Sequence, residues 1–231
     1  MKSLTFDAQI SSFSNVIYEL LEKNLEILSS DQLSDTTKDI LNKLHNRSSC
    51  IEDLKISLRV ITNALYTYYQ QKVIVLIDEY DVPLQAAYQN NYYEEMVEFL
   101  RSVFSSALKT NDALEKGVMT GCLRISKESI FTGLNNFKIL SIDDARYDEQ
   151  FGFTDAEVSD LLEDYDLSGH FAEIKEWYDG YHFGNADIYC PWDVINHVDH
   201  LLQEPDVCPQ AYWINSSGND LVKRFVDKAD K

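Results

Sequence analysis

Apolar residues recur at three- and four-residue spacing over much of the amino-terminal part of the chain, a period typical of amphipathic helices. Residues 13–28 carry such a stripe, and further stripes cover residues 35–44 and 51–70. Before them, residues 2–7 (KSLTFD) alternate polar and apolar positions and predict a short strand. The pattern therefore predicts one short strand followed by three helices.

The pattern changes at residue 73. Residues 73–81 read VIVLIDEYD, five β-branched or leucine residues followed by a cluster of three acids. An uninterrupted apolar run is typical of a strand buried on both faces, as in parallel sheets covered by helices. A helix over residues 96–108 and a strand over residues 117–120 follow, so we predict a βαβ unit. Its acids would lie at the carboxyl end of the sheet, where open α/β sheets bind ligands.

The pattern weakens after Gly121. Residues 137–142 predict another strand, and Thr154 with Glu157 forms a capping box that opens a helix through Leu162. Further helices are expected from Phe171, over residues 192–202 and from Asn219.

A turn-rich stretch over residues 178–190 separates the first two of these helices. The aromatic residues around it predict a packed core for this part of the chain: Trp177, Tyr178, Tyr181, Phe183, Tyr189 and Trp192. The sequence shows no repeat or low-complexity linker. We therefore predict an incomplete α/β core over residues 1–145 and a mainly helical carboxyl-terminal extension over residues 146–231.

Glycine is scarce and unevenly placed. The chain has 8 glycines in 231 residues, and none precedes Gly117. The common phosphate-binding loops need glycine at fixed spacing. Because the sequence contains neither a Gly-Lys dipeptide nor two glycines two positions apart, it has no Walker A loop and no dinucleotide fingerprint.

Acidic residues dominate the charge: 39 acids against 20 bases give a net charge of −19. This charge opposes binding to nucleic acids or to an anionic membrane. Ten of the acids lie in residues 143–166 with Arg146 as the only base, which indicates a solvated face or, as the alternative, a site for a cation or a basic partner.

Cysteine usage and the amino terminus suggest a compartment. The four cysteines are scattered without a C-x-x-C pair, the amino terminus lacks the apolar region of a signal peptide, and the longest aliphatic run is too short to span a bilayer. We therefore expect a cytoplasmic protein with no membrane partner.

The strongest candidates for chemistry follow the two predicted strands. An apolar strand that delivers an aspartate and then a glutamate, here Asp78 and Glu79, is typical of a Walker B element: the aspartate holds Mg²⁺ through water, and the glutamate orients or deprotonates the attacking water. The alternative is an ordinary surface edge. Thr120, at the end of the neighbouring strand, is placed to contact a γ-phosphate or that water, and Arg124 is within reach of the same charge or pairs with a nearby acid.

Other candidates carry less chemistry. His197 and His200 have a possible metal spacing, yet no further histidine or cysteine stands at a matching interval. Cys122 has no adjoining histidine and is interpreted as a small buried filler. A nuclease built from Asp78, Glu79 and Lys127 lacks the expected spacing of such a core.

Taken together, five ordered blocks resemble the predicted AAA-ATPase-like family, bacterial P-loop proteins often followed by a nuclease-like domain of the PD-(D/E)XK type. The blocks are VIVLIDEYDVPL, GVMTGCLRISKESIFTGLNNFKILSID, FGFTDAEV, WYDGYHFG with IYCPWDVIN, and YWINSSGND. The resemblance covers about residues 72–220. Residues 2–7 look like the strand that follows the P-loop helix in that family.

The resemblance implies an α/β P-loop NTPase-like fold, a three-layer parallel sheet that binds ATP and Mg²⁺. It implies Asp78 and Glu79 as the Walker B pair, with Asp78 as the metal-binding residue, Thr120 in the sensor position and Arg124 near the phosphates. Members of the family carry a Gly-Lys-Ser loop on a first, central strand, and this sequence begins after it and ends before a nuclease-like domain. We therefore expect a sheet that lacks its first strand and P-loop, and no ATP hydrolysis by the chain alone.

A different class of function stays open. The acidic face of residues 143–166 and the sheet edge left by the absent strand suit a non-enzymatic interaction module. Its partner would be another protein chain or a missing amino-terminal segment that supplies the strand.

Overall fold

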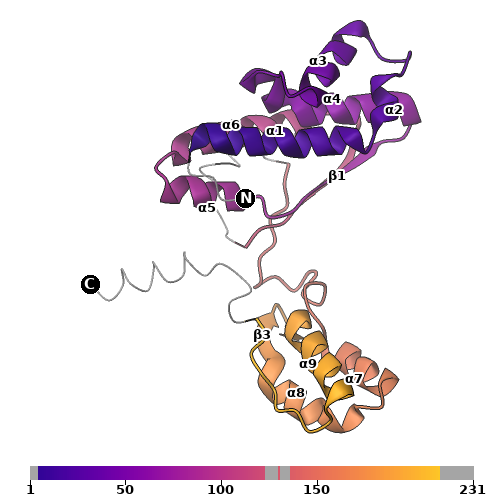
Figure 1. Ribbon diagram of the computed structural model, residues 1–231, viewed down its shortest axis with the longest axis vertical. Helices are drawn as coiled ribbons and strands as arrows, with labels where there is room; N and C mark the ends of the chain where they lie inside the picture. Colours follow the sequence, from indigo (N-terminus) through magenta and orange to yellow (C-terminus); the bar gives the residue numbers. More distant parts are fainter. Residues whose placement is uncertain (1–4, 123–129, 131–135, 214–231) are drawn as a thin grey trace. The chain divides into compact units, whose positions relative to one another are not determined.

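In the computed structural model the chain divides into two compact units, Met1–Phe137 and Lys138–Lys231 (Figure 1). The structure describes residues 5–122, 130 and 136–213. Both units combine helices with a two-stranded sheet, which makes the chain a mixed α/β protein. None of the helices in the described ranges has both the length and the apolar character that crossing a bilayer requires.

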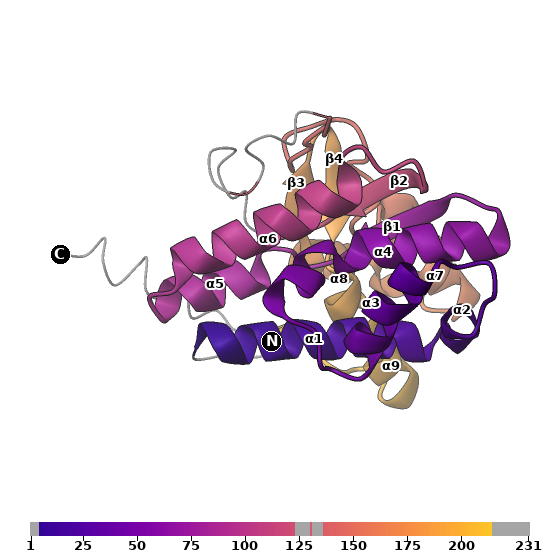
Figure 2. The ribbon, with the colours of Figure 1, turned by 90° about the horizontal axis from the view of Figure 1, so that it is seen from above.

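The first unit opens with a group of helices (Figure 2). They are α1 (Phe6–Glu22), α2 (Leu25–Leu28), α3 (Asp35–His45) and α4 (Ile51–Tyr69). The stripes over residues 35–44 and 51–70 predicted α3 and α4. The single helix predicted over residues 13–28 is wrong, because α1 starts at Phe6 and ends at Glu22, and a break at Lys23 and Asn24 separates it from α2. The apolar sides of these helices form one core with α6 (Tyr93–Leu108). Fully buried members of that core include Leu21, Leu41 and Leu44.

The predicted strand over residues 2–7 is wrong for the part that the structure describes. Phe6 and Asp7 lie in the first turn of α1, whose N-cap Thr5 accepts a hydrogen bond from the Ala8 backbone N–H at 3.3 Å. The ring of Phe6 meets that of Phe99 edge to face, with centroids 6.5 Å apart. Capping and this aromatic contact favour helix over the short alternating pattern.

The predicted βαβ unit is present. It consists of β1 (Val73–Ile77), α5 (Val82–Gln89), α6 and β2 (Leu114–Met119). The two strands are parallel, and their register pairs Leu76 with Val118 and Ile77 with Met119. Pro83 stands in the first turn of α5, where its missing N–H costs nothing. The unit thus brings the carboxyl ends of β1 and β2 to one edge of the sheet.

One face of this sheet differs from expectation. Val75 and Ile77 pack against the helical core, whereas Ile74 and Leu76 are 58% and 73% exposed. Burial on both faces was predicted, and it is wrong because the core helices of this unit pack on one side only. A three-layer P-loop NTPase sheet stays a prediction, since β1 and β2 are the only strands of the first unit within the described residues.

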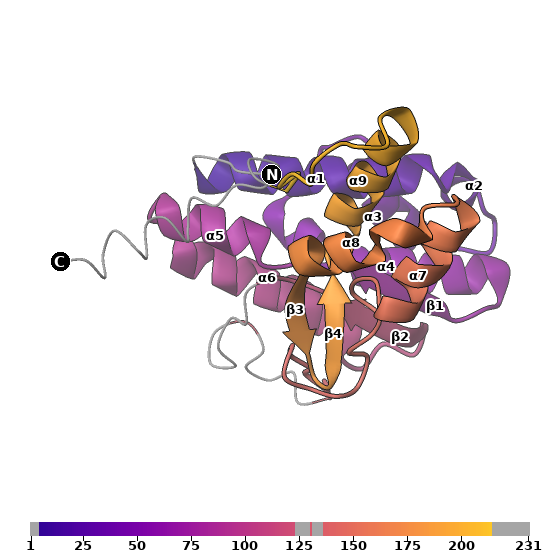
Figure 3. The same cartoon turned by 90° about the horizontal axis from the view of Figure 1, so that it is seen from below.

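The second unit is built from short helices and a hairpin (Figure 3). Its elements are α7 (Asp155–Asp164), the 3₁₀ turn η1 (Ser168–His170), α8 (Phe171–Tyr178), β3 (Asp179–Phe183), β4 (Ala186–Tyr189) and α9 (Pro191–Gln203). The predicted capping box of α7 is present: Thr154 Oγ1 accepts from the Glu157 N–H, and the Glu157 carboxylate accepts from the Thr154 N–H at 2.9 Å.

Three expectations for the second half of the chain have different outcomes. The strand over residues 137–142 is wrong, because that stretch forms no ladder. The turn-rich stretch contains the antiparallel pair β3 and β4, joined at Gly184, whose φ of 54° suits a tight hairpin. The helix expected from Asn219 lies outside the described residues.

The aromatic core of the second unit is smaller than predicted. Tyr178 and Tyr189 are buried, but Trp177, Tyr181 and Trp192 are each about half exposed. Aliphatic residues from α7, α8 and α9 fill the interior instead. In the acidic segment, residues 143–166, all of the acids except Asp148 are exposed, which agrees with a solvated face; a cation or basic partner at this segment stays a prediction.

Candidate functional site

The ends of β1 and β2 bring Asp78 and Thr120 together. The Thr120 N–H donates to the Ile77 carbonyl at 2.9 Å and the Tyr80 N–H donates to the Thr120 carbonyl at 3.1 Å, so the pairing of the two strands continues beyond their last residues. The Thr120 hydroxyl donates to Asp78 Oδ1. Two residues that are 42 positions apart in sequence thus meet at the carboxyl end of the sheet.

Asp78 continues the exposed side of β1. Ile74, Leu76 and Asp78 alternate with the less exposed Val75 and Ile77. The carboxylate therefore stands at the end of the exposed apolar stripe, where a ligand has access to it. Within the described residues it makes no ion pair.

Glu79 has an unusual backbone. Its φ is 53°, in the left-handed region that residues with a Cβ rarely adopt. Asp78 Oδ1 accepts the Glu79 N–H at 2.9 Å, and the Glu79 carbonyl accepts from the Val82 N–H at 3.1 Å. These two hydrogen bonds hold the backbone of Glu79 in this conformation. Such a conformation costs about 1–3 kcal/mol and is found preferentially at functional sites. The Glu79 residue itself is exposed.

Asp81 differs from the other two acids of the cluster, because it is fully buried. Its Oδ1 accepts the Cys122 backbone N–H at 3.2 Å, and its Oδ2 accepts from Gln85 Nε2 at 2.7 Å. The sequence pattern gave roles to Asp78 and Glu79 and none to Asp81, and the structure gives two exposed carboxylates and, in Asp81, a buried one that links two segments. No pattern in the sequence indicated the burial of Asp81, although the glycine directly after Thr120 was a signal of close packing there.

The carboxylates also affect the neighbouring thiol. Partial desolvation of the Cys122 thiol raises its pKa, and the negative charges of Asp81, Glu79 and Asp78 raise it further. A thiol in this environment stays protonated and is not an activated nucleophile. The interpretation of Cys122 as a buried filler is wrong, since the residue is exposed on the loop after β2.

The donor set fits Mg²⁺ in one specific way. Within the ranges that the structure describes, no group of three acidic, histidine or cysteine side chains is arranged to hold a metal ion. Mg²⁺ commonly keeps several waters and uses one or two carboxylates together with substrate phosphates. An exposed carboxylate such as that of Asp78, which pairs with no cation among the described residues, suits that arrangement and does not suit an all-protein metal cage.

The remaining candidates, Arg124, His197 and His200, do not join the contact between Asp78 and Thr120 in the described part of the chain. Arg124 lies outside the described residues. His197 is fully buried, and neither of its ring nitrogens has a hydrogen-bond partner among the described residues, while His200 Nδ1 lies 3.0 Å from the Tyr212 hydroxyl. The two imidazoles therefore have separate environments and do not form a metal site with other described side chains.

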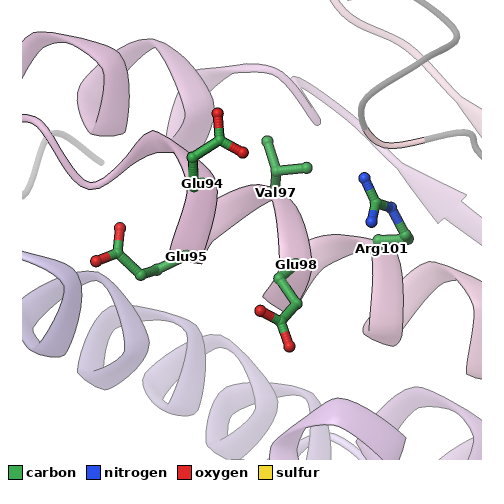
Figure 4. A pocket seen from close by; sticks show the side chains of 5 residues that line it. All are labelled: Glu94, Glu95, Val97, Glu98 and Arg101. Atoms are coloured by element: carbon green, nitrogen blue, oxygen red, sulfur yellow. The ribbon is translucent and has the colours of Figure 1, made fainter.

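A shallow hollow lies along α6 and is shown in Figure 4. It is lined by Glu94, Glu95, Val97, Glu98 and Arg101. All five side chains come from a single helix, and the lining includes none of Asp78, Glu79 or Thr120. Its composition, mostly carboxylates, gives it no role in binding an anionic nucleotide.

Comparison with known proteins gives a relative and a family. A protein of Azotobacter chroococcum mcd 1, described as "Uncharacterized protein in vnfD 5'region", is 33% identical over 149 residues, which is 63% of this chain. The chain spans only 27% of the length of that relative. No solved structure matches the chain. The pattern of the family described as predicted AAA-ATPase matches residues 5–131, and the chain therefore belongs to this family.

Proposed function

We propose that the first unit supplies the Walker B and sensor side of an ATP site. The observation that carries this proposal is the contact between the Thr120 hydroxyl and the Asp78 carboxylate at the ends of two parallel strands. A hydroxyl and a carboxylate from adjacent strand ends are the groups that a metal-bound γ-phosphate needs on this side.

Each residue has a distinct role in the proposal. Asp78 would hold Mg²⁺ through water, and the ion would supply the positive charge that balances the phosphates. Glu79, held next to it by the strained turn, orients or deprotonates the attacking water. Thr120 fixes the Asp78 carboxylate and contacts the γ-phosphate or the water. These roles use only groups at one edge of the sheet.

The phosphate-binding loop must come from elsewhere. The sequence contains no Gly-Lys dipeptide, so it lacks the backbone donors, the lysine and the hydroxyl that such a loop provides. We therefore propose that the chain alone neither binds MgATP tightly nor hydrolyses it. A strand, loop and helix carrying Gly-Lys-Ser, in another segment or another chain, would complete the site.

Titration with MgATP tests this proposal. The chain is compared with a fusion that carries the Gly-Lys-Ser strand, loop and helix of a family member at its amino terminus, by calorimetry and phosphate release. We expect binding and turnover only in the fusion. Asp78→Asn should abolish the magnesium dependence of binding, while Glu79→Gln should keep binding and lose hydrolysis.

Glu115→Gln, an exposed glutamate on β2, is the matched control and should change nothing. Hydrolysis by the unfused chain would overturn the requirement for an added loop. If Asp78→Asn leaves the binding of MgATP by the fusion unchanged, the assignment of the site is overturned.

The exposed face of the sheet favours a second candidate, a non-enzymatic interaction module. Ile74, Leu76 and Val118 are exposed side chains on β1 and β2, and parallel sheets are normally covered. The occupant in this alternative is a strand and helix from another protein chain. Asp78→Ala and Glu79→Ala would then leave binding unchanged while Leu76→Glu weakens it, which a pull-down with the separate loop-bearing segment measures.

A further inference from the structure

The loop after β2 is tied to the turn after β1 by a carboxylate that does not join the Asp78 and Thr120 contact. Asp81 is 0% exposed, and its two oxygens accept hydrogen bonds from different segments, the Cys122 N–H and the Gln85 side chain. A buried carboxylate is tolerated only when such donors satisfy it. Asp81 therefore fixes the residue that stands two positions after Thr120.

Asp81 makes this contact in place of a more usual one. It is the N-cap residue of α5, yet its side chain makes no capping hydrogen bond to that helix. Aspartate at an N-cap ordinarily accepts from the backbone N–H two or three residues later. Here one carboxylate oxygen accepts from the loop after β2, so the carboxylate connects the ends of two strands. Asp81 and Cys122 are 41 positions apart in the sequence.

Gly121 leaves the space for the carboxylate. A Cβ atom at this position would lie 2.6 Å from Asp81 Oδ1 and 2.7 Å from Tyr80 Cε1. Both distances are far shorter than carbon makes with such atoms, so any other residue would displace Asp81 or the tyrosine ring. Glycine at position 121 and aspartate at position 81 thus belong to one arrangement.

We propose that Asp81 is a positioning residue of the nucleotide site and not a third metal-binding acid. By holding Cys122 against the turn after β1, it sets Thr120 beside Asp78. This inference rests on the proposed function, because it assigns the origin of the geometry on which that function depends. The three acids of the cluster then have different roles: Asp78 and Glu79 face the ligand, and Asp81 holds the loop after β2 against the turn after β1.

Backbone amide NMR of the nucleotide-free chain tests the proposal. Asp81→Asn keeps an oxygen that can accept the Cys122 N–H but removes its negative charge, so this hydrogen bond weakens: the Cys122 amide proton should shift upfield and the Thr120 amide signal should move with it. Asp81→Asn combined with Gln85→Glu should restore both signals, because the new amide donates to the new carboxylate while its oxygen accepts from Cys122. Gly121→Ala should reproduce the effect of Asp81→Asn by displacing the carboxylate.

Ile61→Val, a change in the buried part of α4, is the control for general loss of stability and should leave the Thr120 and Cys122 signals in place. Unchanged Thr120 signals in Asp81→Asn, or no recovery in the double variant, would overturn the proposal. If Asp81→Asn does not fold, Gly121→Ala decides: its Cβ displaces the Asp81 carboxylate that accepts the Cys122 N–H, and unchanged Cys122 and Thr120 signals would again overturn the proposal. Since no nucleotide is present, these outcomes are independent of whether the completed site binds MgATP.

Discussion

Each unit of the protein contains a carboxylate that accepts a hydrogen bond from a hydroxyl far away in sequence, and the two pairs have opposite surroundings. In the second unit Asp155 accepts from the buried Tyr189 hydroxyl at 2.5 Å and from Lys175 Nζ at 2.6 Å. In the first unit Asp78 accepts from Thr120, and within the described residues no cation pairs with it.

The difference in charge balance separates a structural pair from a ligand-facing one. The hydrogen bond from Lys175, and then that from Tyr189, lower the pKa of Asp155, which keeps its carboxylate ionised and occupied. Among the described residues Asp78 has the same chemistry without a cation beside it, and we propose that its charge faces a ligand. The same two functional groups thus stabilise one unit and are proposed to bind a ligand in the other.

The largest expected effect is on the pair formed by Asp155 and Tyr189 in the second unit. Asp155→Ala leaves the buried Tyr189 hydroxyl without an acceptor and should lower the free energy of unfolding of the second unit by about 2 kcal/mol. All three tryptophans lie in that unit, so tryptophan fluorescence during urea unfolding reports on it alone.

Tyr189→Phe added to Asp155→Ala provides the control. The double variant has no unsatisfied hydroxyl, so the second change should cost less than it does in the wild-type protein. Equal costs in both backgrounds would show that the two groups are not coupled.

A second effect distinguishes the units by pH. Burial lowers the pKa of His197 and its neighbours His170 and His200 lower it further, against the opposing charge of Glu173. Below a pH of about 6.5 the imidazole of His197 binds a proton in the unfolded chain but stays neutral in the folded unit. The free energy of unfolding of the second unit should therefore decrease as the pH falls, by at most about 1.4 kcal/mol per pH unit, until the pH reaches the lowered pKa of His197.

Urea unfolding at pH 7.5 and 5.5, followed by tryptophan fluorescence, measures this slope. His197→Phe keeps an aromatic ring at the buried position and should flatten it. If the slope is the same in both proteins, another group carries the pH dependence and the buried imidazole does not distinguish the units.

Local patterns predicted the elements whose stability is local. The stripe of residues 51–70 and the capping box at Thr154 and Glu157 each specify a helix through contacts within a few residues, and both helices are present. The alternation over residues 2–7 was too short to decide between periods, and the cap at Thr5 decides it. The hairpin of β3 and β4 had a signal in Gly184 and Asn185, a glycine-containing turn between two aromatic segments.

The candidate site was predictable only as far as the βαβ rule reaches. Parallel strands place Asp78 and Thr120 at one edge of the sheet, whatever the rest of the fold does. The burial of Asp81 depends on the path of the loop after β2, and the exposure of Leu76 depends on which face the helices cover. Both are tertiary facts that residues 73–81 do not encode by themselves.

A smaller effect tests the strained turn in the first unit. Glu79→Gly relieves the left-handed conformation and should raise the free energy of unfolding of this unit by about 0.5–1 kcal/mol. Glu79→Ala removes the same carboxylate but keeps a Cβ, so it should not stabilise. Amide hydrogen exchange of the core residues in α4 and α6 measures both, and equal protection in the two variants would show that the turn stores no strain.

The smallest expected effect is on the pair formed by Asp78 and Thr120 in the first unit. Asp78→Asn keeps an oxygen that accepts from Thr120 and removes an exposed charge next to Glu79, so the stability of the first unit should change by less than about 0.5 kcal/mol, in the stabilising direction. Hydrogen exchange of β1 and β2 measures this change. A loss comparable with that of Asp155→Ala would mean that the fold uses the Asp78 carboxylate as it uses that of Asp155, and that Asp78 does not face a ligand.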